Sequence, residues 1–382
     1  MKIFPYGRQS IDDADIKEVV RVLESDFITQ GPEIEKFENS FSRFVDSRYA
    51  VTSNSATSSL HVACMSLDLS PGDSIWTSPN SFVASSNCGL YCGATVDFVD
   101  IELTTSNIDI AMLEKKLKLA KKNHSLPKIL IPVHFAGNSC DMKSIGALSQ
   151  EYNFSVIEDA SHCVGAEYDS AKVGACKYSD ACIFSFHPVK IMTTGEGGMM
   201  TTNSKKLYEK SIMLRSHGVT RNEGLMQDQP HGQWYFEQQL LGYNYRMTDI
   251  AAVLGSSQLR KVSKWVDRRR DIAKLYNQKI THRQVRTLDL DRFDGSAHHL
   301  YVIHLDNYES RNKLFSYLRD LNILVNVHYI PIHLHPYYRN LGFQEGMFPI
   351  AEQHYQTAIS LPMYPSLTNE DVGYIADLIN KF

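Results

Sequence analysis

The chain has 382 residues, and its 39 basic and 43 acidic side chains give a net charge of −4. Without a basic tract, this balance gives no support for binding to nucleic acid or to an anionic membrane surface. No run approaches the ~18 apolar residues of a membrane-spanning helix and no signal-peptide core opens the chain, so we expect a cytoplasmic protein.

Two amphipathic helices are predicted near the N-terminus, over about 12–25 and 33–45, with a polar turn at 26–32 between them. Their apolar positions at helical spacing are Ile16, Val19, Val20 and Leu23 in the first helix and Ile34, Phe37, Phe41 and Phe44 in the second. We interpret the apolar face of the second helix as core packing.

From residue 49 the chain alternates strand-like runs with helical stretches, which is typical of a largely parallel α/β sheet. A helix follows the first strand, after the polar segment Asn54–Ser59. The strands expected up to residue 160 are 49–52, 74–77, 95–99, 128–134 and 155–159.

The last third of the chain predicts a smaller α+β lobe. A long helical region is expected over about 248–280. The elements expected after it are a strand at 300–305, a helix at 310–321, a strand at 324–327, and then loops and two helices. We therefore predict a large domain over 1–255 and a small domain over 256–382, with a boundary inside or beside a helix.

Metal chemistry is not expected. The seven cysteines are scattered, without a CxxC pair or a Cys/His cluster at zinc-ligand spacing, and we interpret them as small buried hydrophobic residues rather than disulfide partners.

The segment 184–198 carries the strongest candidate for chemistry, Lys190. Apolar runs at 181–186 and 199–202 predict a strand on each side, so Lys190 is expected on a loop. Three glycines at 195, 197 and 198 let the chain turn sharply after it. A lysine presented in this way could form a Schiff base with a carbonyl, although most lysines are solvated surface charges.

Other segments match what an enzyme needs to hold pyridoxal 5′-phosphate (PLP) by its phosphate, ring nitrogen and ring face. Asn54–Ser58 offers hydroxyls and backbone N–H groups at a helix N-terminus, where a phosphate is favoured, although an ordinary helix cap has the same pattern. Asp159 ends an apolar strand, where its carboxylate could keep a pyridine nitrogen protonated; a solvated strand end is the alternative.

Two further side chains are candidates for the cofactor ring. Phe82 follows a strand end and could stack on the ring face, although by itself it would be assigned to the core. His162 could bond the phenolic oxygen of the ring, and a structural histidine is an equally good interpretation.

Taken together, segments 54–58, 158–162, 184–198 and 241–249, with Phe82, resemble the DegT/StrS family of nucleotide-sugar aminotransferases. The similarity covers essentially the whole chain. It implies the α/β architecture of fold type I PLP enzymes, with a mainly parallel seven-stranded sheet in the large domain and a smaller α+β C-terminal domain.

The resemblance also implies roles for single residues. Lys190 matches the lysine that binds PLP as a Schiff base, and Asp159 matches the partner of the pyridine nitrogen. Ala56, Thr57 and Ser185 match phosphate contacts.

Phe82 matches the aromatic residue that stacks on the ring, and His162 completes the expected cofactor set. Asn244 matches an asparagine that reaches the phosphate in the neighbouring subunit, which implies a homodimer with composite sites.

Within the family, the chain resembles most the aminotransferases of pseudaminic acid synthesis, through segments 4–7, 25–31, 185–190, 193–198 and 327–333. Those enzymes use L-glutamate, with pyridoxamine phosphate as an intermediate, to aminate C4 of UDP-2-acetamido-2,6-dideoxy-β-L-arabino-hexos-4-ulose. The residues that this resemblance assigns to the sugar-nucleotide site are Tyr6, Asp26, Phe27, Ile28, Thr29, Asn326, Val327, His328 and Tyr329.

Alternatives remain open. A perosamine-type or 4-amino-arabinose-type transferase would share this chemistry, because a few pocket contacts decide the sugar. A pyridoxamine-dependent sugar dehydratase would replace Lys190 with histidine, and a non-enzymatic PLP-fold sensor would be favoured by a lost lysine or an added DNA-binding domain. Segment 221–237 is longer than expected; we interpret it as a surface loop, with a lid or a subunit contact as alternatives.

Overall fold

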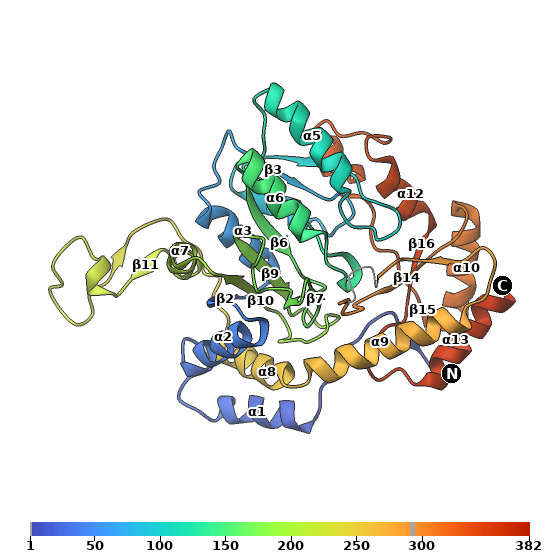
Figure 1. The fold of residues 1–382 in the computed structure, drawn as a ribbon. Coiled ribbons are helices and arrows are strands. Elements are labelled where there is room, and N and C mark those ends of the chain that lie inside the picture. Colours follow the sequence, from blue (N-terminus) through green and yellow to red (C-terminus); the bar gives the residue numbers. More distant parts are fainter. Residues whose placement is uncertain (1, 291–294) are drawn as a thin grey trace.

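The computed structural model describes residues 2–290 and 295–382 and centres on a seven-stranded sheet of order β2-β10-β9-β6-β5-β3-β4 (Figure 1). The strands are β2 (Tyr49–Ser53), β3 (Ser74–Thr77), β4 (Thr95–Phe98), β5 (Ile129–Ile131), β6 (Ser155–Asp159), β9 (Ala181–Ser185) and β10 (Gly198–Thr202). Only β10 runs antiparallel to its neighbours in this sheet. The mainly parallel sheet of a fold type I enzyme is therefore confirmed.

Helices cover both faces of this sheet. On one face, α3 (Ala56–Ser66), α4 (Ala84–Tyr91) and α7 (Lys205–Arg215) share an apolar core with Ile129 and Ile131 of β5. On the other face, Leu130 packs with α5 (Ile110–Lys122) and α6 (Met142–Tyr152). Successive strand residues point to opposite faces, so a central strand with both faces covered is apolar at every position.

The N-terminal helices are α1 (Asp13–Leu23) and α2 (Pro32–Val45), and both pack on α8 (Asp249–Leu259). Phe37 and Phe41 of α2 are fully buried against Phe184 and Phe186, as the sequence predicts.

The helical region expected over 248–280 is confirmed, and the structure divides it into two helices, α8 and α9 (Val262–Lys279), with a break at Arg260 and Lys261. The break has no proline or glycine. It follows from packing, because α8 lies on α1 and α2 whereas α9 lies on α13 (Asn369–Lys381).

The C-terminal part builds a second sheet from β13 (Arg286–Thr287), β14 (Tyr301–His304) and β16 (Ala358–Leu361). Its remaining helices are α10 (Tyr308–Asp320), α11 (Pro336–Arg339) and α12 (Pro349–Thr357). The sequence predicted only loops and helices where β16 lies. That strand is fully buried against β14, and its pairing depends on residues far away in the chain.

The strand expected at 324–327 is shorter, β15 (Ile323–Leu324), and it pairs with β1 (Phe4–Pro5). The N-terminal segment thus joins the C-terminal part (Figure 1). The proposed domain boundary at residue 255 falls within α8, and the division into 1–255 and 256–382 stays a prediction.

Segment 221–237 lies in an arm that projects from the body between β11 (Val219–Thr220) and β12 (Glu237–Gln238) (Figure 1). Across the described residues, each helix is too short or too polar to cross a membrane. The cytoplasmic location expected from the sequence stays a prediction.

Candidate active site

A cavity of about 860 Å³ opens where β2, β6 and β9 end. Ligands of open α/β sheets bind at this carboxyl edge, and the volume lies in the range of small-molecule sites. The sequence-predicted residues that line the cavity are Tyr6, Ala56, Thr57, Phe82, Asp159, His162, Ser185, Lys190, Asn326, Val327, His328 and Tyr329.

The N-terminus of α3 forms one wall of the cavity. Ser55 caps this helix by accepting a hydrogen bond from the Ser58 N–H at 3.1 Å, and the Ser58 hydroxyl donates to the Asn54 side chain at 2.6 Å. The first N–H groups of a helix have no partner within it, so those of Ala56 and Thr57 are suited to an anion. Gly198 allows the tight packing here, because a Cβ at this position would lie 2.5 Å from the Ala56 nitrogen.

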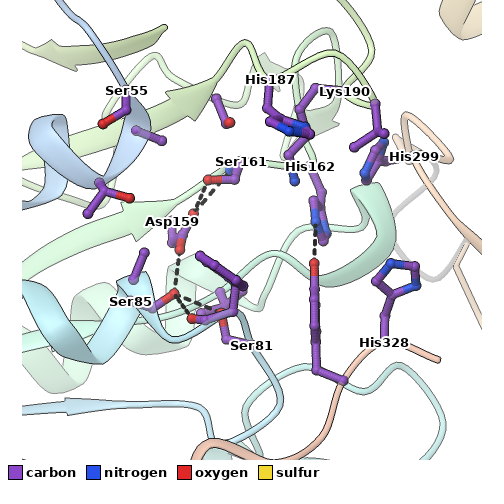
Figure 2. A pocket seen from close by; sticks show the side chains of 18 of the residues that line it. Ser55, Ser81, Ser85, Asp159, Ser161, His162, His187, Lys190, His299 and His328 are labelled. Atoms are coloured by element: carbon purple, nitrogen blue, oxygen red, sulfur yellow. Dashed lines mark hydrogen bonds between the residues drawn. The ribbon is translucent and has the colours of Figure 1, made fainter. Parts of the chain in front are cut away.

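Asp159 lies at the floor of the cavity with 5% of its surface exposed. Its Oδ2 accepts a hydrogen bond from the Ser85 hydroxyl at 2.6 Å (Figure 2). Its Oδ1 accepts from the Ser161 hydroxyl at 2.6 Å and from the Ser161 N–H at 3.2 Å. A carboxylate this deep in the cavity is suited to pair with a cationic ring nitrogen.

Lys190 lies on the loop between β9 and β10, as the sequence predicts. The loop is closed by backbone bonds: the Lys190 N–H donates to the His187 carbonyl at 2.9 Å, and the Thr194 N–H donates to the Phe186 carbonyl at 3.0 Å. Burial lowers the pKa of Lys190 to about 8, although the charge of Asp159 acts in the opposite direction. Near neutral pH, a larger fraction of this amine is therefore uncharged than in an ordinary lysine.

Three neutral histidines, His162, His299 and His328, line the same cavity as the lysine (Figure 2). The ring centroids of His162 and His299 lie 4.4 Å apart. Burial holds the pKa of both rings well below the ordinary value for histidine. Burial also lowers the pKa of His328 to about 3. The cavity is therefore polar at pH 7 without additional positive charge from these rings.

The hydrogen bonds of His162 define its tautomer. Its Nδ1 accepts from the Ala136 N–H at 3.3 Å, so the proton of the neutral ring is on Nε2, which donates to the Tyr329 hydroxyl oxygen at 3.2 Å. The Tyr329 hydroxyl is thus left to donate its own proton elsewhere.

The outer wall comes from both ends of the chain. The ring of Tyr6 lies 5.0 Å from that of His328, and residues 326–329 continue this wall. Phe82 at the mouth is 62% exposed, which leaves a large aromatic face open to a ligand ring.

Five predicted site residues do not line the cavity of the same chain: Asp26, Phe27, Ile28, Thr29 and Asn244. All five are exposed. The segment 26–29 lies against the start of α8, because Thr29 forms a bridge with Thr248 and the Ile28 carbonyl accepts from the Asp249 N–H at 3.0 Å.

The sequence did not assign a role to Ser85, Ser161 or His299, which also line the cavity. His187, which the sequence suggested as support for the loop or the substrate, lines it as well. Ser161 follows Asp159 by two residues, and an aspartate side chain commonly accepts from the backbone N–H at that spacing. The Ser161 hydroxyl then lies close to the same oxygen. Ser85 and His299 gave no such signal, because they approach the site from other parts of the chain.

The sheet, the lysine of lowered pKa, the buried carboxylate and the helix N-terminus around one cavity together define a PLP-dependent transferase of fold type I. The chain belongs to the DegT/DnrJ/EryC1/StrS aminotransferase family, whose model matches residues 9–380.

Two relatives and one solved structure illustrate the range of similarity. The UDP-4-amino-4,6-dideoxy-N-acetyl-beta-L-altrosamine transaminase of Campylobacter jejuni is 35% identical, over 98% of this chain and 96% of that one. The GDP-perosamine synthase of Escherichia coli O157:H7 is 34% identical, over 100% and 99%. PseC of Helicobacter pylori, an aminotransferase of pseudoaminic acid biosynthesis, superposes with a TM-score of 0.91 at 32% identity, over 100% and 99%.

The protein is therefore a PLP-dependent nucleotide-sugar aminotransferase. Similar solved structures include Spr1654 from Streptococcus pneumoniae in its PLP form and in its pyridoxamine phosphate (PMP) form. The residues of this chain fit the cofactor: the cavity holds an aromatic face, a carboxylate, a lysine and a helix N-terminus with which Gly198 makes close contact.

Proposed function

We propose that this enzyme transfers the amino group of L-glutamate to C4 of UDP-2-acetamido-2,6-dideoxy-β-L-arabino-hexos-4-ulose, in pseudaminic acid biosynthesis. The observation that carries the proposal is the outer wall, where Tyr6 and residues 326–329 meet Lys190 in one cavity. These are the positions through which the sequence resembles the enzymes that use this sugar. The relatives from Campylobacter jejuni and Helicobacter pylori support it.

In this proposal, the α3 N-terminus and Ser185 hold the phosphate, Asp159 pairs with the ring nitrogen and Phe82 covers the ring. When bound, PLP supplies the electron sink and carries the amino group from the donor to the sugar. The protein therefore has to orient the two substrates and to move protons.

Lys190 moves the proton at the reacting carbon. With its lowered pKa, a substantial fraction of its Nζ is an uncharged amine near pH 7 to 8, which suits a general base. It would take the α-proton of L-glutamate, and the donor would leave as 2-oxoglutarate after giving up its amino group. With the keto sugar, the same amine acts in the reverse direction, and the product is the 4-amino sugar.

The partner in this proposal is a second copy of the chain. The exposed position of Asn244 and residues 26–29 outside their own cavity supports a homodimer in which they complete the cavity of the partner subunit. Asn244 would reach the cofactor phosphate, and residues 26–29 would contact the sugar nucleotide.

Mixing two variants tests the dimer. Lys190→Ala and Asn244→Ala homodimers should each be weakly active, whereas a mixed dimer regains one intact site. At random exchange, about one quarter of wild-type activity should return, since half of the dimers are mixed and half of their sites are intact. No recovery in a mixture that mass spectrometry shows to contain mixed dimers would contradict a composite site.

The substrate is tested by incubating the holoenzyme with L-glutamate and the UDP-linked keto sugar, and identifying the product by mass spectrometry and NMR. A new C4 amine is expected, and Lys190→Ala protein is the control. The GDP-linked keto sugar that leads to perosamine serves as the competing substrate, because the perosamine synthase relative has nearly the same identity. Amination of the GDP-linked sugar alone would overturn the proposed specificity.

A further inference from the structure

Both carboxylate oxygens of Asp159 already accept hydroxyl hydrogen bonds at 2.6 Å, from Ser85 and from Ser161 (Figure 2). We propose that Ser85 and Ser161 are positioning residues which orient this carboxylate and keep the shared proton on the ring nitrogen of the cofactor. This inference rests on the proposed pairing of Asp159 with that nitrogen.

The two serines approach from different elements. Ser85 lies in the first turn of α4 with 1% of its surface exposed, and Ser161 lies in the loop after β6. Because they bond to opposite oxygens, they fix the rotation of the carboxyl group as well as its position.

Ser85 is itself held by a third hydroxyl. Its Oγ lies 2.7 Å from the Oγ of Ser81, which is 4% exposed. A serine has one proton to donate, and a bond at 2.6 Å to a charged oxygen is stronger than the alternative at 3.3 Å to the Phe82 carbonyl. Ser81 therefore donates to Ser85, and Ser85 donates to Asp159.

These donors have a chemical consequence for the ring. Hydrogen bonds from hydroxyls stabilise the ionised form of a carboxylate, so it attracts a shared proton less strongly. Oδ1 already accepts from both the hydroxyl and the N–H of Ser161, whereas Oδ2 accepts from Ser85 and keeps a second acceptor site. A ring N–H can therefore bond to Oδ2 without displacing a serine. The ring nitrogen then keeps its proton, so the ring remains a strong electron sink.

The proton position can be measured directly on the holoenzyme loaded with PLP that carries ¹⁵N in the ring. In the wild type, the ¹⁵N resonance should lie at the protonated pyridinium value. In the Ser85→Ala/Ser161→Ala protein it should shift toward the value of neutral pyridine, and PLP should bind roughly tenfold more weakly.

Two variants serve as controls. Ser86 is the next residue of α4, is fully buried, and bonds to Tyr338 rather than to Asp159. Ser86→Ala therefore removes a buried hydroxyl from the same helix and should leave the ¹⁵N resonance in place. Ser161→Thr keeps a hydroxyl at this position. With Ser85 left unchanged, this variant should retain the wild-type resonance.

The outcomes separate the two levels of the proposal. A wild-type resonance at the neutral pyridine value would overturn the role of Asp159 and the serine inference with it. A protonated wild type together with an unchanged resonance in the folded double-alanine protein would overturn the serine inference alone. A shift of equal size in Ser86→Ala would also overturn it, because the effect would then be a general one of helix α4.

Discussion

The floor and the outer wall of the cavity are built in different ways. The floor residues Asp159 and Ser185 are the last residues of β6 and β9, and Lys190 follows β9 by five residues. The outer wall comes from residues near the N-terminus and from 326–329, which meet through the pairing of β1 with β15. The floor follows from the topology of one sheet, whereas the wall depends on contacts between distant parts of the chain.

This difference separates two kinds of role. Side chains at the ends of parallel strands share one edge, so the floor can carry chemistry that is common to many PLP enzymes. The wall can vary without disturbing the sheet, which suits the choice of sugar. Changes in the floor should therefore affect cofactor and chemistry, and changes in the wall should affect the sugar substrate.

Lys190→Ala should have the largest effect. Without the amine, the visible absorbance band of the lysine-bound cofactor should disappear and transamination should fall by at least ~10³-fold, because proton transfer loses its base. Lys205, which is exposed at the start of α7, provides the matched control Lys205→Ala with normal activity. Wild-type turnover in the Lys190 variant would contradict the assignment of the chemistry to the floor of the cavity.

Asp159→Ala should reduce kcat by ~10²-fold, because the charge that stabilises the protonated ring is lost. Cofactor retention should also weaken, measured as PLP released on dialysis. Asp159→Asn is the isosteric comparison, and it should be nearly as defective because it lacks the charge. Unchanged kinetics in both variants would show that this floor position is not needed.

The rate at which PLP loads onto the apoprotein should depend on the pKa of Lys190. Only the uncharged amine attacks the aldehyde, and burial lowers this pKa from 10.5 to about 8. Loading followed by stopped-flow absorbance should therefore rise about tenfold per pH unit below 8 and level off above it. A rise that continues unchanged to pH 10 would indicate an ordinary lysine.

Tyr329→Phe tests the wall with the smallest expected effect. The hydroxyl that accepts from His162 is removed, while the ring and the floor remain. The KM for the keto sugar should rise roughly tenfold, as for one lost hydrogen bond, with the cofactor absorbance and the KM for L-glutamate nearly unchanged. If the variant lost cofactor binding instead, Tyr329 would act on the cofactor, as the floor residues do.

The sequence predicted most of the sheet and the floor. Strands 74–77 and 155–159 have the predicted bounds, and Lys190 lies on the predicted loop. These features are readable because each depends on a short run of residues: apolar strands end at polar side chains, and glycines allow the turn after the lysine.

Tertiary structure alone decided the rest. The break between α8 and α9, the pairing of β15 with β1 and the bond from Ser85 to Asp159 join elements that are distant in the chain or that pack on different neighbours. Local patterns do not contain these contacts, because the same apolar spacing fits more than one partner. By itself, the sequence determined which residues end the strands, and packing determined which side chains meet them.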